Sequence, residues 1–308
     1  MSKILITGVS GFVGSYISPE LCLNHNVSAI SRERILTNFN EVFSWENYAN
    51  TPCDYDVVIH LAGLAHDTSN SKDEKEYFNV NLDLTAGLVN WINQSKNHVR
   101  LIYMSSIKVY NDSFLINEET FKSPSSIYGK SKLAAENSII NHLSKNHTYY
   151  ILEPAMIYGI GNKGNLPKLF HSLAKGLPYP FSGWKNKRSI LAIENLNFII
   201  TQLIRSDIPS DFFVVSDDEP LSTVEMIDEL FKKTNRSFIR FTLPSFLVVT
   251  FIWLANTFGV NKLNKLLGNL EIDNSKIIKA LNIKKLPFSV RASLNALGRH
   301  MEANEKMK

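Results

Sequence analysis

Short apolar runs alternate with longer amphipathic segments through the first half of the chain. Runs rich in β-branched and aromatic residues predict strands at 3–7, 27–30, 57–62, 101–106 and 149–154. Helical spacing of apolar residues predicts helices over about 12–24, 74–95 and 127–144. Strands that alternate with helices are typical of βαβ units, so we expect an α/β fold with a doubly wound parallel sheet.

The pattern changes after residue 155, where loops rich in Gly, Pro and Asn separate the predicted helices. The runs at 191–196 and 211–217 predict a return to the sheet, and the remainder is mainly helical in pattern. We therefore expect a sheet domain over 1–155, with 190–217 returning to it. A smaller, mainly helical lobe is expected over 156–189 and 218–308.

One segment, residues 246–258, is strongly apolar. It is shorter than the roughly 20 residues that a membrane-spanning helix needs, so it predicts a buried helix. A surface that faces a membrane or a partner is the alternative. The first residues run directly into a predicted strand, without the basic and apolar regions of a signal peptide. We expect a cytoplasmic protein without membrane insertion.

The composition is that of an ordinary globular protein. The 308 residues are 44% hydrophobic and 20% charged, which excludes a disordered or collagen-like chain. Cys22 and Cys53 lie in unrelated contexts, with no CxxC pair and no histidine cluster, so we expect neither a disulfide framework nor a metal site. The net charge of +4 suits an anionic ligand but is spread along the chain. No nucleic-acid partner is expected.

A glycine loop follows the first predicted strand and opens the first predicted helix. Gly8 permits a tight turn, Gly11 lets the backbone approach a pyrophosphate, and Gly14 lets the helix lie close to the sheet. The helix N-terminus offers free N–H groups and a positive dipole end to the phosphates. We expect Gly8, Gly11, Phe12, Val13 and Gly14 to bind a dinucleotide in a Rossmann-like domain, with a tight turn that binds no ligand as the alternative.

The end of the second strand bears on which dinucleotide binds. An acidic side chain here suits the ribose 2′-OH of NAD, whereas an arginine suits the 2′-phosphate of NADP. The chain reads Ser31 and Arg32, followed by Glu33 one position late. The permanently charged, planar guanidinium favours NADP(H), with NAD(H) as the alternative and a solvated loop arginine as the non-functional interpretation.

A tyrosine and a lysine stand four residues apart at the start of a predicted helix. This spacing puts Tyr128 and Lys132 on one helical face, where an ammonium group can lower the pKa of a phenol. The positive charge of a nicotinamide would add to this effect. Ser106 ends a predicted strand at the carboxyl edge of the sheet. There it could hydrogen-bond the substrate oxygen that Tyr128 protonates or deprotonates.

These motifs together resemble a known family. In order and spacing, TGVSGFVG, HLAG, NVN, SSIKVY, YGKSK and AMIYGIG resemble the extended short-chain dehydrogenase/reductases, in the branch of NAD(P)-dependent sugar-nucleotide epimerases and dehydratases. The resemblance implies that Ser106, Tyr128 and Lys132 carry catalysis. It also implies that Leu61, Ala62 and Gly63 line the cofactor, that Tyr128 contacts it, and that Lys132 binds the nicotinamide ribose.

The resemblance assigns structural roles to other polar residues. It implies that Asn81 ties the central strand to a neighbouring helix. His60 and His66 are interpreted as structural or loop residues rather than catalytic ones. Glu153 is a departure, because relatives usually have arginine at this place in the strand. Met156 is another, because several sugar-nucleotide epimerases have asparagine there.

The residues beside Ser106 narrow the expected chemistry. Dehydratases of the family carry an acid pair directly after the strand-end hydroxyl residue, whereas this chain has Ile107 and Lys108. The same absence argues against the decarboxylating members. Plain hydride transfer at a secondary alcohol or ketone remains.

The second half contains the segments NKRSILAIENL, FFVVSDDEPLST and LLGNLEIDNSKI. They resemble bacterial enzymes of surface-polysaccharide (O-antigen) biosynthesis that act at C4 of UDP-linked N-acetylhexosamines or their 4-keto-6-deoxy derivatives. This likeness implies that Arg188 grips the pyrophosphate of a UDP-sugar and that Asn165 contacts the uracil or a phosphate.

Two hydride reactions compete. A 4-epimerase retains its NAD⁺ and returns the hydride to the other face of the sugar, whereas a 4-ketoreductase consumes NADPH or NADH and releases it. The Ser31–Arg32 pair favours the reductase. A non-catalytic dinucleotide sensor is a remote alternative. Members of the family often build a four-helix homodimer from the helices predicted at 74–95 and 127–144, although both faces could instead pack within the monomer.

Overall fold

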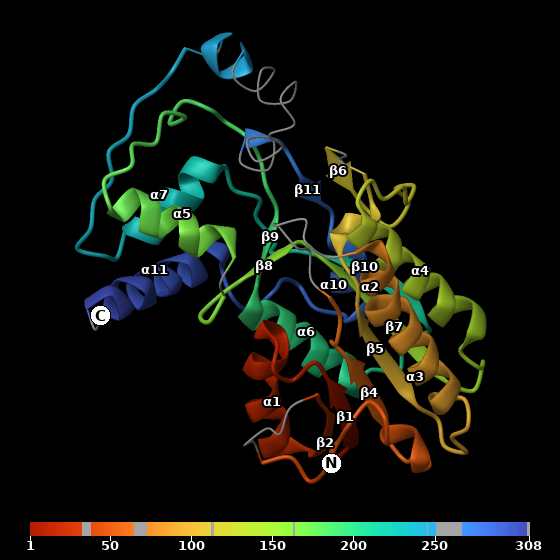
Figure 1. The fold of residues 1–308 in the computed structure, drawn as a ribbon. Coiled ribbons are helices and arrows are strands. Elements are labelled where there is room, and N and C mark those ends of the chain that lie inside the picture. The colour runs from red at the N-terminus through yellow and green to blue at the C-terminus, as the bar shows by residue number, and fades with distance from the viewer. Residues whose placement is uncertain are drawn as a thin grey trace.

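The computed structural model describes residues 1–32, 38–64, 73–111, 114–162, 164–244, 246–250 and 267–306. The larger, α/β part of the protein is a twisted sheet with helices on both faces, and a smaller, mainly helical lobe lies beside it (Figure 1). The C-terminal helix belongs to the smaller lobe, while the N-terminus lies at the sheet.

The central sheet has seven strands in the order β10-β7-β5-β4-β1-β2-β3, and all of its pairs are parallel. The strands are β1 (Lys3–Thr7), β2 (Asn26–Ile30), β3 (Val42–Phe43), β4 (Val57–His60), β5 (Arg100–Met104), β7 (Thr148–Pro154) and β10 (Asp211–Val215). The chain winds outward in one direction from β1 and then in the other from β4. This order confirms the expected Rossmann-like fold and creates a switch point between β1 and β4.

Helices cover both faces of the sheet. They are α1 (Phe12–Asn24), α2 (Glu74–Phe78), α3 (Leu84–Ile92), α4 (Ile127–His142) and α6 (Ile193–Arg205). Successive strand residues alternate between two cores, so that Ile4 and Ile6 pack with α1 and α6 while Leu5 packs with α3 and α4. Except for the short edge strand β3, the strands are mostly buried on both faces, as parallel strands are.

The helix predicted over 74–95 is interrupted. A π-helical segment, Asn79–Asp83, separates α2 from α3. Its Asn81 side chain accepts a hydrogen bond from the Leu64 backbone N–H (2.7 Å) and donates one to the Ser131 hydroxyl (2.9 Å). Asn81 is buried, and these contacts with distant segments satisfy the polar atoms of its side chain.

The strand predicted over 191–196 is wrong beyond its first residues. β9 (Ile190–Ala192) pairs with β8 (Met156–Tyr158) in a separate small sheet, and α6 begins at Ile193. The Asp217 carboxylate accepts hydrogen bonds from the Ala192 backbone N–H, which fixes the start of the helix. The apolar residues after Ala192 have helical spacing. A run as short as 191–196 cannot show this spacing, so the run alone does not distinguish a strand from the start of a helix. The strand predicted over 211–217 is confirmed as β10.

The smaller lobe packs around a core of its own, which includes Phe170, Leu230 and Leu294. Its main helices are α5 (Asn165–Ala174), α7 (Thr223–Phe231) and α11 (Val290–Lys306). A capping box between Ser222 and Glu225 opens α7. The remaining short elements are η1 (Tyr48–Asn50), η3 (Ile107–Val109), β6 (Leu115–Ile116), β11 (Glu271–Ile272) and α10 (Ser275–Ala280). The proposed domain limits stay a prediction.

The apolar segment at 246–258 only partly follows the prediction of a buried helix. Residues 246–250 are helical, and Val248 is buried. Phe246, Leu247 and Val249 are exposed, which corrects the expectation for these positions. Residues 251–258 lie outside the described part of the chain. Within that part, no helix has both the length and the apolar character that crossing a membrane requires.

Gly298 permits the contact between α7 and α11. A Cβ atom added there would lie 1.8 Å from the Leu230 carbonyl oxygen. We expect Gly298→Ala to lower the free energy of unfolding by about 1–3 kcal/mol, although alanine is ordinarily the better helix former. Chemical denaturation of this variant beside Arg299→Ala, an exposed position on the same helix, provides the measurement. A Gly298→Ala protein as stable as the wild type would contradict the close contact.

Candidate active site

The glycine loop forms the tight turn that the sequence predicted. Gly8 has φ +73°, and a Cβ atom there would lie 2.6 Å from the Ala62 backbone N. A Cβ on Gly14 would lie 2.3 Å from the Gly8 carbonyl oxygen. Gly11 is the N-cap of α1, and no side chain caps this end. Glycine is therefore required sterically at two positions, and the uncapped helix start fits a pyrophosphate.

The neighbouring strand end completes this side of the site. The Thr7 hydroxyl accepts a hydrogen bond from the Ala62 backbone N–H (3.0 Å), joining the carboxyl ends of β1 and β4. Leu61 and Val13 are half-buried against the core beneath. Phe12 lies beside the positions that a Cβ would take on Gly159 and Gly161. Thr7 could not be predicted from the sequence, because a threonine at a strand end has no distinctive spacing.

The end of β2 presents a hydroxyl and a cation. Ser31 is buried, and its backbone N–H donates to the Phe43 carbonyl (2.9 Å). Arg32 is exposed. Glu33 lies outside the described residues. The arrangement leaves the Arg32 guanidinium at the surface beside the end of the strand, where a 2′-phosphate would lie in a Rossmann-like domain.

Gly63 lies between the glycine loop and Lys132. A Cβ atom on Gly63 would lie 3.0 Å from both the Lys132 ammonium nitrogen and the Asn81 side-chain oxygen. The lack of a side chain keeps open the space beside Lys132. The residues present therefore fit a dinucleotide whose phosphates lie at the start of α1 and whose reactive ring lies near Lys132.

Ser106 and Tyr128 meet. Ser106 is buried at the start of η3, and its hydroxyl accepts a hydrogen bond from the Lys108 backbone N–H (3.2 Å). Tyr128 is in the first turn of α4 and hydrogen-bonds the Ser106 side chain. The two elements approach closely because residue 129 is glycine, whose added Cβ would lie 2.1 Å from the Lys108 carbonyl oxygen.

Lys132 lies one turn further along α4 and points toward the end of β5. Its ammonium group donates to the Met104 carbonyl (2.8 Å) and to the Tyr103 hydroxyl (3.3 Å). Burial lowers the pKa of Lys132 to about 8, while the Glu136 carboxylate acts in the opposite direction. Ser106, Tyr128 and Lys132 thus gather at one sheet edge, as the motifs predicted.

The expected lowering of the Tyr128 pKa does not occur in the protein alone. Burial raises the pKa of the phenol, and Tyr77 adds to this, although the hydrogen bond with Ser106 acts to lower it. The Lys132 ammonium group hydrogen-bonds Met104 and Tyr103, and Lys132 is not among the groups that shift the Tyr128 pKa. The side chains alone therefore favour the neutral phenol.

His60 is a structural residue in this fold. It is fully buried between the hydroxyls of Thr7 (2.7 Å) and Thr85 (3.0 Å), and burial lowers its pKa to about 3. The imidazole is therefore neutral at physiological pH. His66 lies outside the described residues. The two cysteines are free, and burial raises the pKa of Cys53 to about 12. In the described ranges, no cluster of metal-ligating side chains occurs.

The two predicted substrate residues belong to the smaller lobe. Asn165 is exposed in the first turn of α5. Arg188 bridges two segments through its backbone, and its guanidinium donates to the Gly268 carbonyl (2.9 Å). Their contact with a substrate stays a prediction.

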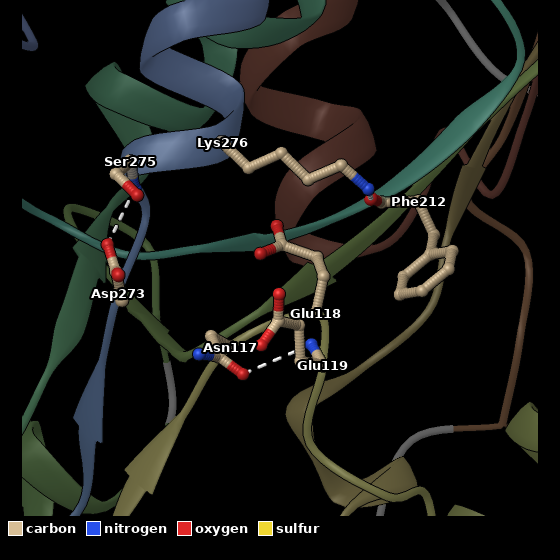
Figure 2. A pocket seen from close by; sticks show the side chains of 7 residues that line it. All are labelled: Asn117, Glu118, Glu119, Phe212, Asp273, Ser275 and Lys276. Carbon is tan, nitrogen blue, oxygen red and sulfur yellow. Dashed lines mark hydrogen bonds between the residues drawn. The ribbon is translucent and has the colours of Figure 1, made fainter.

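A pocket of about 430 Å³ lies at the outer edge of the sheet and is separate from these residues. Figure 2 shows Glu118, Phe212 and Lys276 facing one another across it. Lys276 already pairs with the Asp211 carboxylate (2.6 Å), and Glu118 accepts a hydrogen bond from the Val214 backbone N–H (3.0 Å). None of the predicted site residues lines this pocket.

Comparison with known proteins extends these observations. The model of the NAD dependent epimerase/dehydratase family matches residues 4–214. The chain is 31% identical to a UDP-glucose 4-epimerase of Vibrio cholerae, over 92% of this chain and 90% of the relative.

Two solved structures show the same fold. UDP-N-acetylglucosamine 4-epimerase from Bacillus cereus has a TM-score of 0.77 at 19% identity, covering 98% of this chain and 99% of that one. The structure of RMD from Pseudomonas aeruginosa complexed with NADPH has a TM-score of 0.74 at 19% identity, covering 98% and 100%.

A side chain at Gly63 is expected to block the dinucleotide. Gly63→Val would fill the space beside Lys132 and Asn81, and we expect dinucleotide affinity to fall at least about tenfold, which corresponds to about 1.4 kcal/mol. Calorimetric titration with NADPH and with NADH measures the affinity, and circular dichroism controls for folding. Wild-type dinucleotide affinity in a folded Gly63→Val protein would show that the nicotinamide ring does not bind in the space beside Lys132.

Proposed function

This chain belongs to the NAD-dependent epimerase/dehydratase family, and we propose that it transfers a hydride at C4 of a UDP-linked N-acetylhexosamine. The observation that carries the proposal is the meeting of Ser106, Tyr128 and Lys132 beside the open position at Gly63. A phenol, a hydroxyl and an ammonium group at the carboxyl edge of the sheet are the groups that carbonyl–alcohol interconversion needs.

The roles of the side chains follow from their contacts. Tyr128 exchanges a proton with the C4 oxygen of the sugar, and the Ser106 hydroxyl, already bonded to Tyr128, holds the same oxygen. Lys132, fixed on the Met104 carbonyl, keeps a positive charge close to the reacting groups. A bound NAD(P) supplies or accepts the hydride. Burial of Tyr128 favours the protonated phenol, which is the form that can donate a proton to the oxygen of a ketone while the carbonyl carbon receives the hydride.

We favour 4-ketoreduction of a UDP-4-keto-6-deoxy-N-acetylhexosamine. Arg32 is exposed beside buried Ser31 at the end of β2, which suits NADPH as a cofactor that exchanges after each turnover. Ile107 and Lys108 follow Ser106, so the chain lacks a carboxylate at the place where the family's dehydratases carry their acid pair. Arg188 and Asn165 are the proposed contacts of the UDP group.

The second candidate is a 4-epimerase acting on UDP-glucose or UDP-N-acetylglucosamine. It is supported by the similarity to the Vibrio cholerae epimerase along almost the whole chain. Both reactions use the same three side chains. They differ in whether the oxidised dinucleotide stays bound between turnovers.

The remaining expectations stay proposals. α3 and α4 lie side by side on one face of the sheet and would form the four-helix homodimer (Figure 1). A cytoplasmic setting in surface-polysaccharide biosynthesis is consistent with a UDP-sugar substrate.

The two reactions are separated by parallel incubations of the purified protein. We expect UDP-4-keto-6-deoxy-N-acetylglucosamine with NADPH to be reduced with one equivalent of NADPH consumed. UDP-N-acetylglucosamine without added cofactor is expected to remain unchanged by NMR. Formation of UDP-N-acetylgalactosamine in the second incubation would establish the epimerase, and inactivity in both would reject the substrate class.

Replacing the phenol tests whether the protein is an enzyme at all. We expect Tyr128→Phe to lower kcat at least about 100-fold, in the range of a lost general acid, while dinucleotide affinity stays unchanged. Stopped-flow turnover and calorimetry measure the two quantities. Full biological activity of Tyr128→Phe in a deletion strain would instead favour a dinucleotide sensor.

A further inference from the structure

A buried charge cluster lies directly behind the catalytic side chains. Glu136 on α4 and Glu153 on β7 are both fully buried, and Lys122 lies between them. The Lys122 ammonium group contacts one oxygen of Glu136 at 2.7 Å and one oxygen of Glu153. The strand β7 therefore contributes a carboxylate to the cluster, and a lysine from the loop before α4 supplies the cation.

Each carboxylate oxygen of this cluster has one hydrogen-bond donor. The second oxygen of Glu136 accepts from the Ser105 hydroxyl, and the second oxygen of Glu153 accepts from the Tyr110 hydroxyl at 2.7 Å. Buried carboxylates persist only when they are paired and hydrogen-bonded in this way. With both ionised, the cluster carries a net charge of −1. Burial and the neighbouring Glu136 raise the pKa of Glu153 to about 7.

Two contacts connect the cluster to the active site. Ser105, which donates to Glu136, is the residue before Ser106. Glu136 lies one helical turn after Lys132 on α4, and its negative charge opposes the effect of burial on the Lys132 ammonium. Glu153 is not among the groups that act on Lys132.

The other groups around Lys132 carry no charge at neutral pH. From β4, His60 is neutral because burial lowers its pKa to about 3. From β5, burial holds the pKa of Tyr103 well above its usual range, so this phenol is neutral. Tyr128, on α4 itself, is also a neutral phenol. Glu136 is thus the anion, among the described residues, that acts on Lys132.

We propose that Glu136 is a positioning residue for the hydride transfer: it keeps Lys132 in its ammonium form and fixes the strand end that carries Ser106, while Lys122 and Glu153 hold Glu136 in place. The catalytic part of this inference rests on the proposed function. The electrostatic part concerns Lys132 itself and can be measured without a substrate.

The test compares two variants with the same chemical change in the same cluster. Glu136→Gln and Glu153→Gln each remove one carboxylate charge. In protein labelled with ¹³C at the lysine Cε, NMR titration follows Lys132, assigned by its absence in Lys132→Met. We expect Glu136→Gln to lower the Lys132 pKa by about one unit, the size of effect that one nearby opposite charge produces. Glu153→Gln is expected to shift it by less than about a third of that.

A third variant keeps the inference testable if Glu136→Gln fails to fold. Lys122→Gln combined with Glu153→Gln conserves the net charge of −1 but places all of it on Glu136, next to Lys132. We expect the Lys132 pKa to rise above the wild-type value. A fall in this double variant, an unchanged titration in folded Glu136→Gln, or equal shifts in Glu136→Gln and Glu153→Gln would each overturn the proposal.

Turnover provides the second readout. A lysine whose pKa falls loses its charge at lower pH, so the alkaline limb of the kcat/KM profile should move to lower pH in Glu136→Gln by the same amount as the NMR titration. Glu136→Asp keeps the carboxylate charge, so we expect its alkaline limb to lie close to that of the wild type. If no substrate is turned over, the proposed function fails while the NMR titration still decides the role of Glu136. An NMR shift without a matching kinetic shift would reject the catalytic part.

Discussion

The geometry of the proposed active site depends on how closely the first turn of α4 approaches the chain that leaves β5. At Gly129 the helix backbone is so close to the Lys108 carbonyl that a Cβ atom would lie 2.1 Å from it. Any larger residue would move Tyr128 away from Ser106. The same helix is held from its other side, because Ser131 receives the Asn81 hydrogen bond and Lys132 donates to Met104.

The close contact at Gly129 follows β5, which is the neighbour of β4 in the sheet. The contact and the switch point together place the proposed site at the carboxyl edge of the sheet. The strand order reverses between β1 and β4, so the loops after these strands diverge and leave space at the carboxyl edge. Gly8 and Gly14 let the first loop and helix pack tightly beneath that space, and Gly63 keeps it open beside Lys132. The smaller lobe, with a core of its own, stands beside the sheet (Figure 1).

Local patterns predicted the parts of the fold whose sequence period is clear. β1 and α1 begin and end at the predicted residues, because an apolar run and a glycine loop mark their limits. The π-helical segment at Asn81 was missed, because it depends on partners at 64 and 131 that no local pattern contains. The strand predicted over 191–196 was wrong because a short apolar run does not distinguish a strand from the start of a helix.

The same distinction, between features that a local pattern marks and features that depend on distant contacts, applies to the proposed site. Ser106, Tyr128 and Lys132 were predicted because their spacing and order are distinctive. In the protein alone, burial raises the pKa of Tyr128, and the sequence does not reveal how deeply this side chain is buried. The cluster of Lys122, Glu136 and Glu153 joins a loop, a helix and a strand, so only the folded chain shows that these charges meet.

The central claim is that these three side chains direct a hydride from the dinucleotide to C4 of the sugar. Turnover of the 4-keto sugar nucleotide with NADPH deuterated at the nicotinamide C4 tests it most directly, with mass spectrometry and NMR of the product. The account predicts one deuterium per product molecule, located at sugar C4, when the deuterated face is the one used. A product without deuterium at C4 from either face-labelled NADPH would contradict it.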